Sequence, residues 1–132
     1  MNAVISKRCI NQKKSPVGDF FDENNDILKL MQIETATNEI DKFILKLDAQ
    51  TQARVLRHLD LLEKYGYKLG MPYSKSLHGG LFELRITGSK QVRILYCFHK
   101  GAIYLLHAFI KKVNKIPKRD INLAIKRLKM LA

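Results

Sequence analysis

The sequence predicts an α+β protein in which an N-terminal helical hairpin packs on a three- to four-stranded antiparallel sheet and a helix follows at the C-terminus. Apolar residues recur at helical spacing over residues 40–65, alternate as in strands over residues 81–111, and return to helical spacing after Pro117. The strand-like segments are joined by short turns that contain glycine, which favours an antiparallel meander.

The helical hairpin is predicted from two amphipathic segments separated by a very short turn. In the longer segment, Asp48–Tyr65, the apolar residues share one face, Asp48 is a candidate N-cap and Gly66 a candidate C-terminal stop. Asn38 is the candidate cap of the shorter segment, whose apolar residues are Ile40, Phe43, Ile44 and Leu47.

Three strands are predicted after a glycine-containing loop, at Leu81–Thr87, Gln91–His99 and Ala102–Lys111. A further short extended piece is expected around Lys75 and Leu77. After the sheet, Pro117 is expected to open the C-terminal helix, since proline is tolerated in a first turn.

Side-chain alternation along the strands predicts one apolar face, covered by the hairpin, and one basic face. The apolar set is Phe82, Leu84, Ile86, Val92, Ile94, Tyr96 and Phe98. Arg85 and Arg93 fall on the other face, where Glu83 is the one carboxylate nearby. Leu95 and Cys97 share that face, so the C-terminal helix is expected to cover part of it. Both arginines are expected to be exposed.

The chain has 132 residues, enough for one domain with one core. Residues 38–132 form the predicted core. Residues 1–37 have a weaker pattern and are interpreted as an atypical N-terminal extension or an insertion.

The net charge of +12 is confined to the second half of the chain. Residues 1–67 hold 10 basic and 10 acidic residues, whereas residues 68–132 hold 14 basic residues and 2 acidic ones. Such segregation favours binding to a polyanion, because each phosphate contact releases condensed counterions. A merely solvated basic surface is the alternative.

Other protein classes fit the sequence poorly. No apolar run is long enough to span a bilayer, and the N-terminus is too polar for a signal peptide. Two distant cysteines make no disulfide framework, so a cytoplasmic protein without a membrane partner is expected. The four histidines lack metal-ligand spacing and there is no glycine-rich phosphate loop, so we expect neither metal nor cofactor.

Cationic side chains can support phosphate chemistry when the substrate is RNA. RNA carries its own nucleophile, the 2′-hydroxyl, so cleavage needs a base, an acid and stabilisation of charge on the phosphate. A lysine crowded by other cations has a lowered pKa and can serve as the base. His107 and His78 are the histidines nearest the basic elements, although a hydrogen-bonded structural role is the commoner one for each.

Three blocks of the sequence resemble one family. They are Lys75–Arg85 (KSLHGGLFELR), Val92–Tyr96 (VRILY), and Leu105–Lys112 (LLHAFIKK) followed by Lys115–Ile121 (KIPKRDI). In order and spacing they resemble RelE/HigB-like toxins of type II toxin–antitoxin systems, in the RelE/ParE superfamily, with most similarity to the phage-derived killer-like branch. The resemblance covers about residues 38–132.

The resemblance implies a RelE-like fold and a ribosome-dependent, metal-independent endoribonuclease that cuts mRNA and so inhibits translation. It also implies a cognate antitoxin, often of helix-turn-helix type. Lys75, Arg85, Arg93 and Lys112 match the family's basic catalytic positions. Where some relatives carry a tyrosine as acid, this chain has Lys118, which makes His107 a candidate acid. The expected RNA-binding residues are Lys111, His78, Lys115 and Lys118.

Two alternatives remain open at this point. A ParE-type toxin shares the fold but poisons DNA gyrase through protein contact. A plain nucleic-acid-binding domain would use its charge for affinity alone. Kinship of fold does not choose among these functions.

Overall fold

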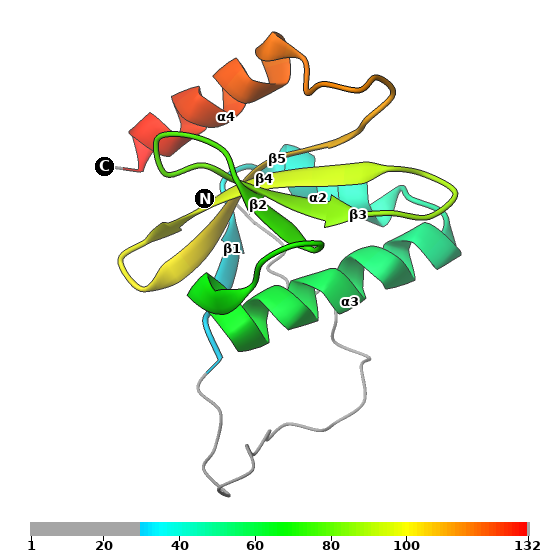
Figure 1. The fold of residues 1–132 in the computed structure, drawn as a ribbon, viewed down its shortest axis with the longest axis horizontal. Helices are drawn as coiled ribbons and strands as arrows, with labels where there is room; N and C mark the ends of the chain where they lie inside the picture. The colour runs from blue at the N-terminus through cyan, green and yellow to red at the C-terminus, as the bar shows by residue number, and fades with distance from the viewer. Residues whose placement is uncertain (1–29, 132) are drawn as a thin grey trace, which may run out of the picture.

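A five-stranded sheet lies between helices on both of its faces in the computed structural model, which describes residues 30–131 (Figure 1). The elements are β1 (Ile33–Thr35), α2 (Asn38–Leu45), α3 (Ala49–Tyr65), the short 3-10 helix η1 (Gly66–Lys68), β2 (Ser74–Ser76), β3 (Phe82–Ile86), β4 (Val92–His99), β5 (Ala102–Ile110) and α4 (Lys118–Met130). Helices α2 and α3 cover one face of the sheet and α4 covers the other (Figure 1).

The sheet is mixed and not purely antiparallel, which corrects the prediction of three or four antiparallel strands. Its order is β1-β5-β4-β3-β2, and the four strands from β2 to β5 are antiparallel neighbours, as predicted. The fifth strand, β1, pairs with β5 in parallel, with Ile33 opposite Ile103. A strand of three residues is too short for its alternation to stand out in a sequence. The α+β class and the C-terminal helix are confirmed.

The two predicted helices are present, but their arrangement differs from a simple N-terminal hairpin. Helix α2 follows β1 and lies against β5, whereas α3 lies against β3, so each helix packs on the sheet. Most of residues 1–37, interpreted as an extension or insertion, lies outside the described residues. Its described part holds β1.

The ends of α3 follow the sequence prediction. The Asp48 carboxylate accepts hydrogen bonds from the Thr51 backbone N–H at 3.0 Å and from the Thr51 hydroxyl at 2.8 Å. Lys90 donates to the same carboxylate at 2.8 Å, and together these donors hold the pKa of Asp48 well below its usual range. Gly66 ends the helix with a φ of +52°, a conformation that favours glycine. For α2, the capping position is Thr37 and not Asn38 as predicted.

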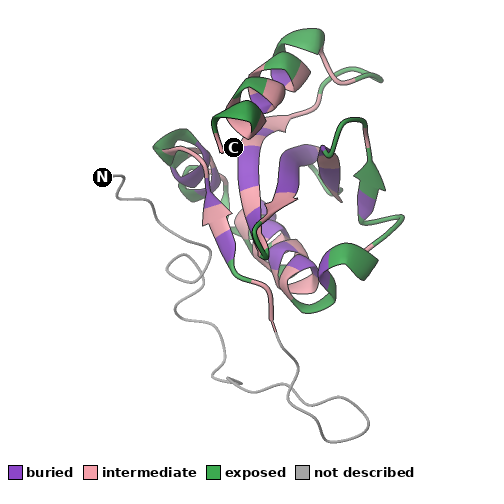
Figure 2. Cartoon of the chain, turned by 90° about the vertical axis from the view of Figure 1, so that its left-hand side faces the viewer, coloured by how far each residue is buried: buried purple, intermediate pink, exposed green. Residues whose placement is uncertain are grey.

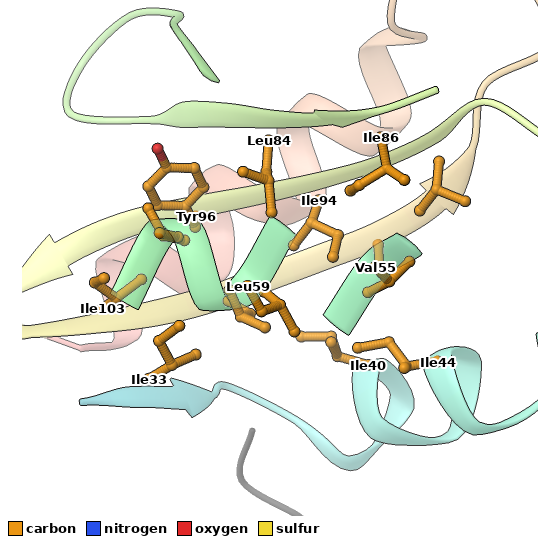
Figure 3. Close-up of a cluster of buried hydrophobic side chains, with 14 residues drawn as sticks. Ile33, Ile40, Ile44, Val55, Leu59, Leu84, Ile86, Ile94, Tyr96 and Ile103 are labelled. Atoms are coloured by element: carbon orange, nitrogen blue, oxygen red, sulfur yellow. The ribbon is translucent and has the colours of Figure 1, made fainter. Parts of the chain in front are cut away.

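The larger core lies between the sheet and the two helices α2 and α3. Figure 3 shows Leu84 and Ile94 of the strands pointing toward Leu59 of α3, with Ile40 and Ile44 of α2 beside them. These side chains are at most 1% exposed. The predicted apolar face of β3 and β4 is therefore the face that the helices cover.

A smaller core lies on the opposite face, under α4. It is formed by Leu81, Leu95, Cys97, Leu106 and Ala124. Burial is concentrated in the strands and on the inward side of the helices, while the outward turns of α4 are exposed (Figure 2). As predicted, the C-terminal helix covers the part of the basic face that carries Leu95 and Cys97, and burial raises the pKa of the Cys97 thiol to about 11.

The Leu59→Ala variant tests this packing. Leu59 is completely buried, so its truncation should lower the free energy of unfolding by about 2–5 kcal/mol through lost burial and a residual cavity. The control is Leu45→Ala, at a residue 48% exposed, which should cost less than about 1 kcal/mol. Urea unfolding measures both, and equal losses would contradict the described core.

Candidate functional site

An open hollow of about 440 Å³ lies where β3, β4 and β5 meet the segment that follows β5. Four cations that the sequence singles out, Arg85, Arg93, Lys111 and Lys112, line it together. Gln91, Val113 and Asn114 complete the lining. The structure thus gathers four of the predicted cations, from β3, β4 and the segment after β5, into one cationic hollow.

Strand register explains why these cations meet. Arg85 on β3 lies directly opposite Arg93 on β4, and Arg93 lies opposite Phe109 on β5. Lys111 extends this pairing beyond β5, since its backbone N–H donates to the carbonyl of Gln91 at 2.7 Å. Because side chains alternate along strands, all of these residues project from the face opposite α2 and α3.

One carboxylate lies behind the two arginines. Glu83 is 3% exposed, and its Oε2 lies 3.2 Å from Arg93 Nε. Its Oε1 lies 3.9 Å from Arg85 Nε. The carboxylate therefore balances part of the positive charge on the basic face, and the remaining cationic charge faces the hollow.

Arg93 is buried, which corrects the expectation that both arginines are exposed. It is 4% exposed, because it lies in a central strand between β3 and β5, whereas the Arg85 side chain is 30% exposed. The Arg93 guanidinium donates to the carbonyls of Val92 at 3.0 Å and Ile86 at 3.4 Å. Burial lowers the pKa of Arg93; Glu83 acts to raise it, and Arg85 lowers it further.

Lys75 lies on the edge strand β2, where it pairs directly with Glu83 of β3. Its side chain is exposed and shares the basic face with Arg85, although it does not line the hollow. The structure places it beside the hollow, two strands away from Arg93.

His107 is engaged with another side chain. Its Nε2 lies 2.7 Å from Asp120 Oδ1 at the start of α4, and its ring stacks on Phe109 with centroids 5.4 Å apart. The contact links β5 to the C-terminal helix, the structural role that is commoner for a histidine. It does not line the hollow.

Three other predicted RNA-binding residues lie at the surface, outside the lining of the hollow. His78 is exposed in the loop between β2 and β3, Lys115 is exposed in the segment before α4, and Lys118 is the first residue of α4.

Gln91 and Asn114 line the hollow but are not among the residues predicted from the sequence. Gln91 stands two residues before Arg93 and so shares its face, a signal that strand alternation does carry. Its side-chain oxygen accepts a hydrogen bond from Arg93 Nη2 at 3.5 Å, which helps to hold the guanidinium. Asn114 lies in the segment between β5 and α4, where no periodicity marks it.

Other features of the described residues bear on what the site can hold. Within residues 30–131, no group of three or more His, Cys, Asp or Glu side chains is placed to bind a metal. No helix in this part of the chain is long and apolar enough to cross a membrane. The chemistry available in the hollow is that of guanidinium and ammonium groups facing an anion.

Comparison with known families identifies the chain. The model of the family described as phage-derived protein Gp49-like (DUF891) matches residues 42–129, which is well over half of the sequence. The chain belongs to this family. Gp49-like proteins are RelE-like toxins associated with toxin–antitoxin modules, so an antitoxin is the implied partner. The match runs from α2 to α4 and includes every cation of the hollow. A search of curated proteins gave no match.

Burial predicts different consequences for the two arginines of this Gp49-like protein. Arg93→Ala should lower the free energy of unfolding by about 3–5 kcal/mol, because it leaves the buried Glu83 without its nearest cation. Arg85→Ala should cost about 1 kcal/mol or less, since Arg85 is partly solvated. Urea denaturation measures both values. Equal and small losses would contradict the buried Glu83–Arg93 pair.

Proposed function

We propose that this Gp49-like protein is the toxin of a type II toxin–antitoxin system and acts as a metal-independent endoribonuclease on mRNA at the ribosome, as RelE/HigB-like toxins do. The observation that supports this most is the convergence of Arg85, Arg93, Lys111 and Lys112 on one open hollow. With Glu83 buried behind them, the open side of the hollow favours an anion of the size and charge of a backbone phosphate.

In this proposal the cations contribute to phosphate binding in different ways. Arg85 is partly exposed, so its planar guanidinium can contact two phosphate oxygens at once. Arg93 supports the site from below, because its guanidinium is already hydrogen-bonded to backbone carbonyls. Lys111 and Lys112 close the opposite wall and stabilise the charge that grows on the phosphate during cleavage.

Cleavage also requires two proton transfers. The 2′-hydroxyl must lose a proton as its oxygen attacks the phosphorus, and the departing 5′-oxygen must gain one as its bond to phosphorus breaks. Lys112 is exposed on the lining of the hollow, so it is our first choice for one transfer, with Lys75 as the alternative. His107 is the weaker candidate, because Asp120 already occupies its Nε2.

The implied antitoxin keeps such an activity in check. We propose a cognate antitoxin of helix-turn-helix type, encoded beside this protein. An antitoxin that inhibits directly would have to cover the cationic hollow or stop the protein from reaching the ribosome.

RNA-end mapping after induction in cells tests the proposed activity. New 5′ ends should appear within translated messages and disappear when translation is blocked. Arg85→Ala should reduce the cleavage by about 100-fold or more, the usual effect of removing one group that stabilises transition-state charge. Lys129→Ala, an exposed lysine on α4 outside the hollow, is the matched control and should cleave like wild type.

The same induction experiment distinguishes the gyrase-directed alternative. Unchanged RNA together with accumulating gyrase–DNA cleavage complexes would contradict the nuclease and support a ParE-type toxin. Full cleavage by the Arg85→Ala variant would show instead that the active site lies elsewhere.

A further inference from the structure

An exposed apolar segment leads into β2. Met71, Pro72 and Tyr73 are consecutive and all exposed, with Met71 64% and Tyr73 41% accessible to solvent. Single exposed apolar residues are common, but three in a row make a continuous apolar surface of the kind that marks binding sites. Neither the larger nor the smaller core includes these residues.

This segment is joined directly to the cationic hollow through Arg85. The Arg85 backbone N–H donates to the carbonyl of Tyr73 at 2.8 Å. The Arg85 side chain, which lines the hollow, lies with Nη1 3.8 Å from the sulfur of Met71. The apolar segment therefore begins at the wall of the hollow that Arg85 forms.

The surroundings of the segment favour nucleic acid as its occupant. Exposed lysines, Lys68 and Lys75, flank it in sequence, so a cation lies on either side of the apolar residues along the chain. Proteins that bind single-stranded nucleic acids combine these two elements, because cations follow the backbone and aromatic faces stack on the bases. The Tyr73 ring also has a neighbour that limits its movement: His58 of α3 packs against it edge-on, with centroids 5.7 Å apart. A ring held in this way loses less conformational entropy when a base stacks on it.

We propose that Met71–Tyr73, at the β2 edge of the sheet, is a base-binding platform for single-stranded RNA, and that it holds a base of the same strand whose phosphate lies in the cationic hollow. This inference rests on the proposed function, because it assigns a binding role to the surface beside the same site. Tyr73 supplies the stacking ring, Met71 and Pro72 extend the apolar surface, and Arg85 connects the platform to the phosphate. The platform adds affinity that depends on the base, whereas the hollow adds affinity that depends on charge.

Binding of two matched RNA probes tests the platform. Both are fluorescent 2′-O-methyl hexanucleotides, which cannot be cleaved because the nucleophile is blocked, and the second lacks the bases at its two central positions. Their phosphates are equal in number, so a difference in affinity reports contacts to bases. Wild type should prefer the complete probe by about fivefold or more, as expected for one stacked base. Tyr73→Ala should reduce this preference to about twofold or less, and Met71→Ala should lower it as well.

Two further variants make the test specific. Tyr73→Phe keeps the ring and should retain the preference. Tyr65→Ala removes a tyrosine of similar exposure, 45%, at the end of α3 that lies away from the β3–β4 turn, and should bind like wild type (Figure 1). Thermal unfolding of each variant confirms that it is folded before its affinity is compared.

Different experimental results would contradict the platform and the proposed function. If wild type binds both probes equally and Arg85→Ala weakens both, the hollow stands and the platform is wrong. If wild type binds neither probe, the platform is wrong, while the proposed function is still decided by the RNA ends mapped after induction in cells. If Tyr73→Ala keeps the base preference but no longer co-purifies with the antitoxin, the surface serves a protein partner and the RNA platform is overturned.

Discussion

The buried carboxylate of Glu83 is the interaction on which the basic face of this protein depends. Arg85 and Arg93 are directly opposite each other on neighbouring strands, an arrangement that is unfavourable for like charges. Glu83 lies 3.2 Å from one guanidinium and 3.9 Å from the other, so its charge attracts both. The dependence is mutual, because a carboxylate that is 3% exposed is stable as an anion only when cations compensate for its lost hydration.

Glu83 supplies one negative charge against the four cations that line the hollow, so the site keeps a net positive charge. One buried carboxylate interacts with the two arginines, while the two lysines that follow β5 complete the cationic lining of the hollow. In the proposed function, a backbone phosphate of RNA supplies negative charge that balances the remaining cations. The rest of the fold keeps these groups in place: α3 fixes the apolar side of β3, and α4 covers the basic face beyond the hollow. The His107–Asp120 contact then anchors the start of α4 to β5.

Most of what the sequence predicts about the site follows from the alternation of side chains along the strands. This alternation placed Arg85, Arg93 and Glu83 on one face, because the side-chain period of a strand is fixed by its geometry. The helix over residues 49–65 was equally clear, since its cap, its apolar stripe and its terminal glycine all agree. The match to the Gp49-like family agrees with the toxin-family resemblance that the same blocks of sequence carry.

What could not be predicted depends on contacts between distant segments. The burial of Arg93 comes from its central position among three strands, which the alternation pattern of β4 alone does not contain. The parallel strand β1 is too short to show a period, and its partner β5 is about 70 residues away in sequence, as is usual for parallel pairs joined by long connections. The contact between His107 and Asp120 could not be predicted, because it depends on where α4 begins relative to β5. In the sequence, nothing distinguishes Met71–Tyr73 from an ordinary loop, because its contact with Arg85 forms only in the folded chain.

The central claim is that the cationic hollow holds a backbone phosphate of RNA. A crystal structure of the protein with a non-cleavable 2′-O-methyl oligonucleotide tests this most directly. The account predicts one ordered phosphate within hydrogen-bond distance of the Arg85 guanidinium and of an ammonium group from Lys111 or Lys112, with Arg93 and Glu83 unchanged behind it. Phosphates ordered along the outward lysines of α4, with no phosphate in the hollow, would contradict it.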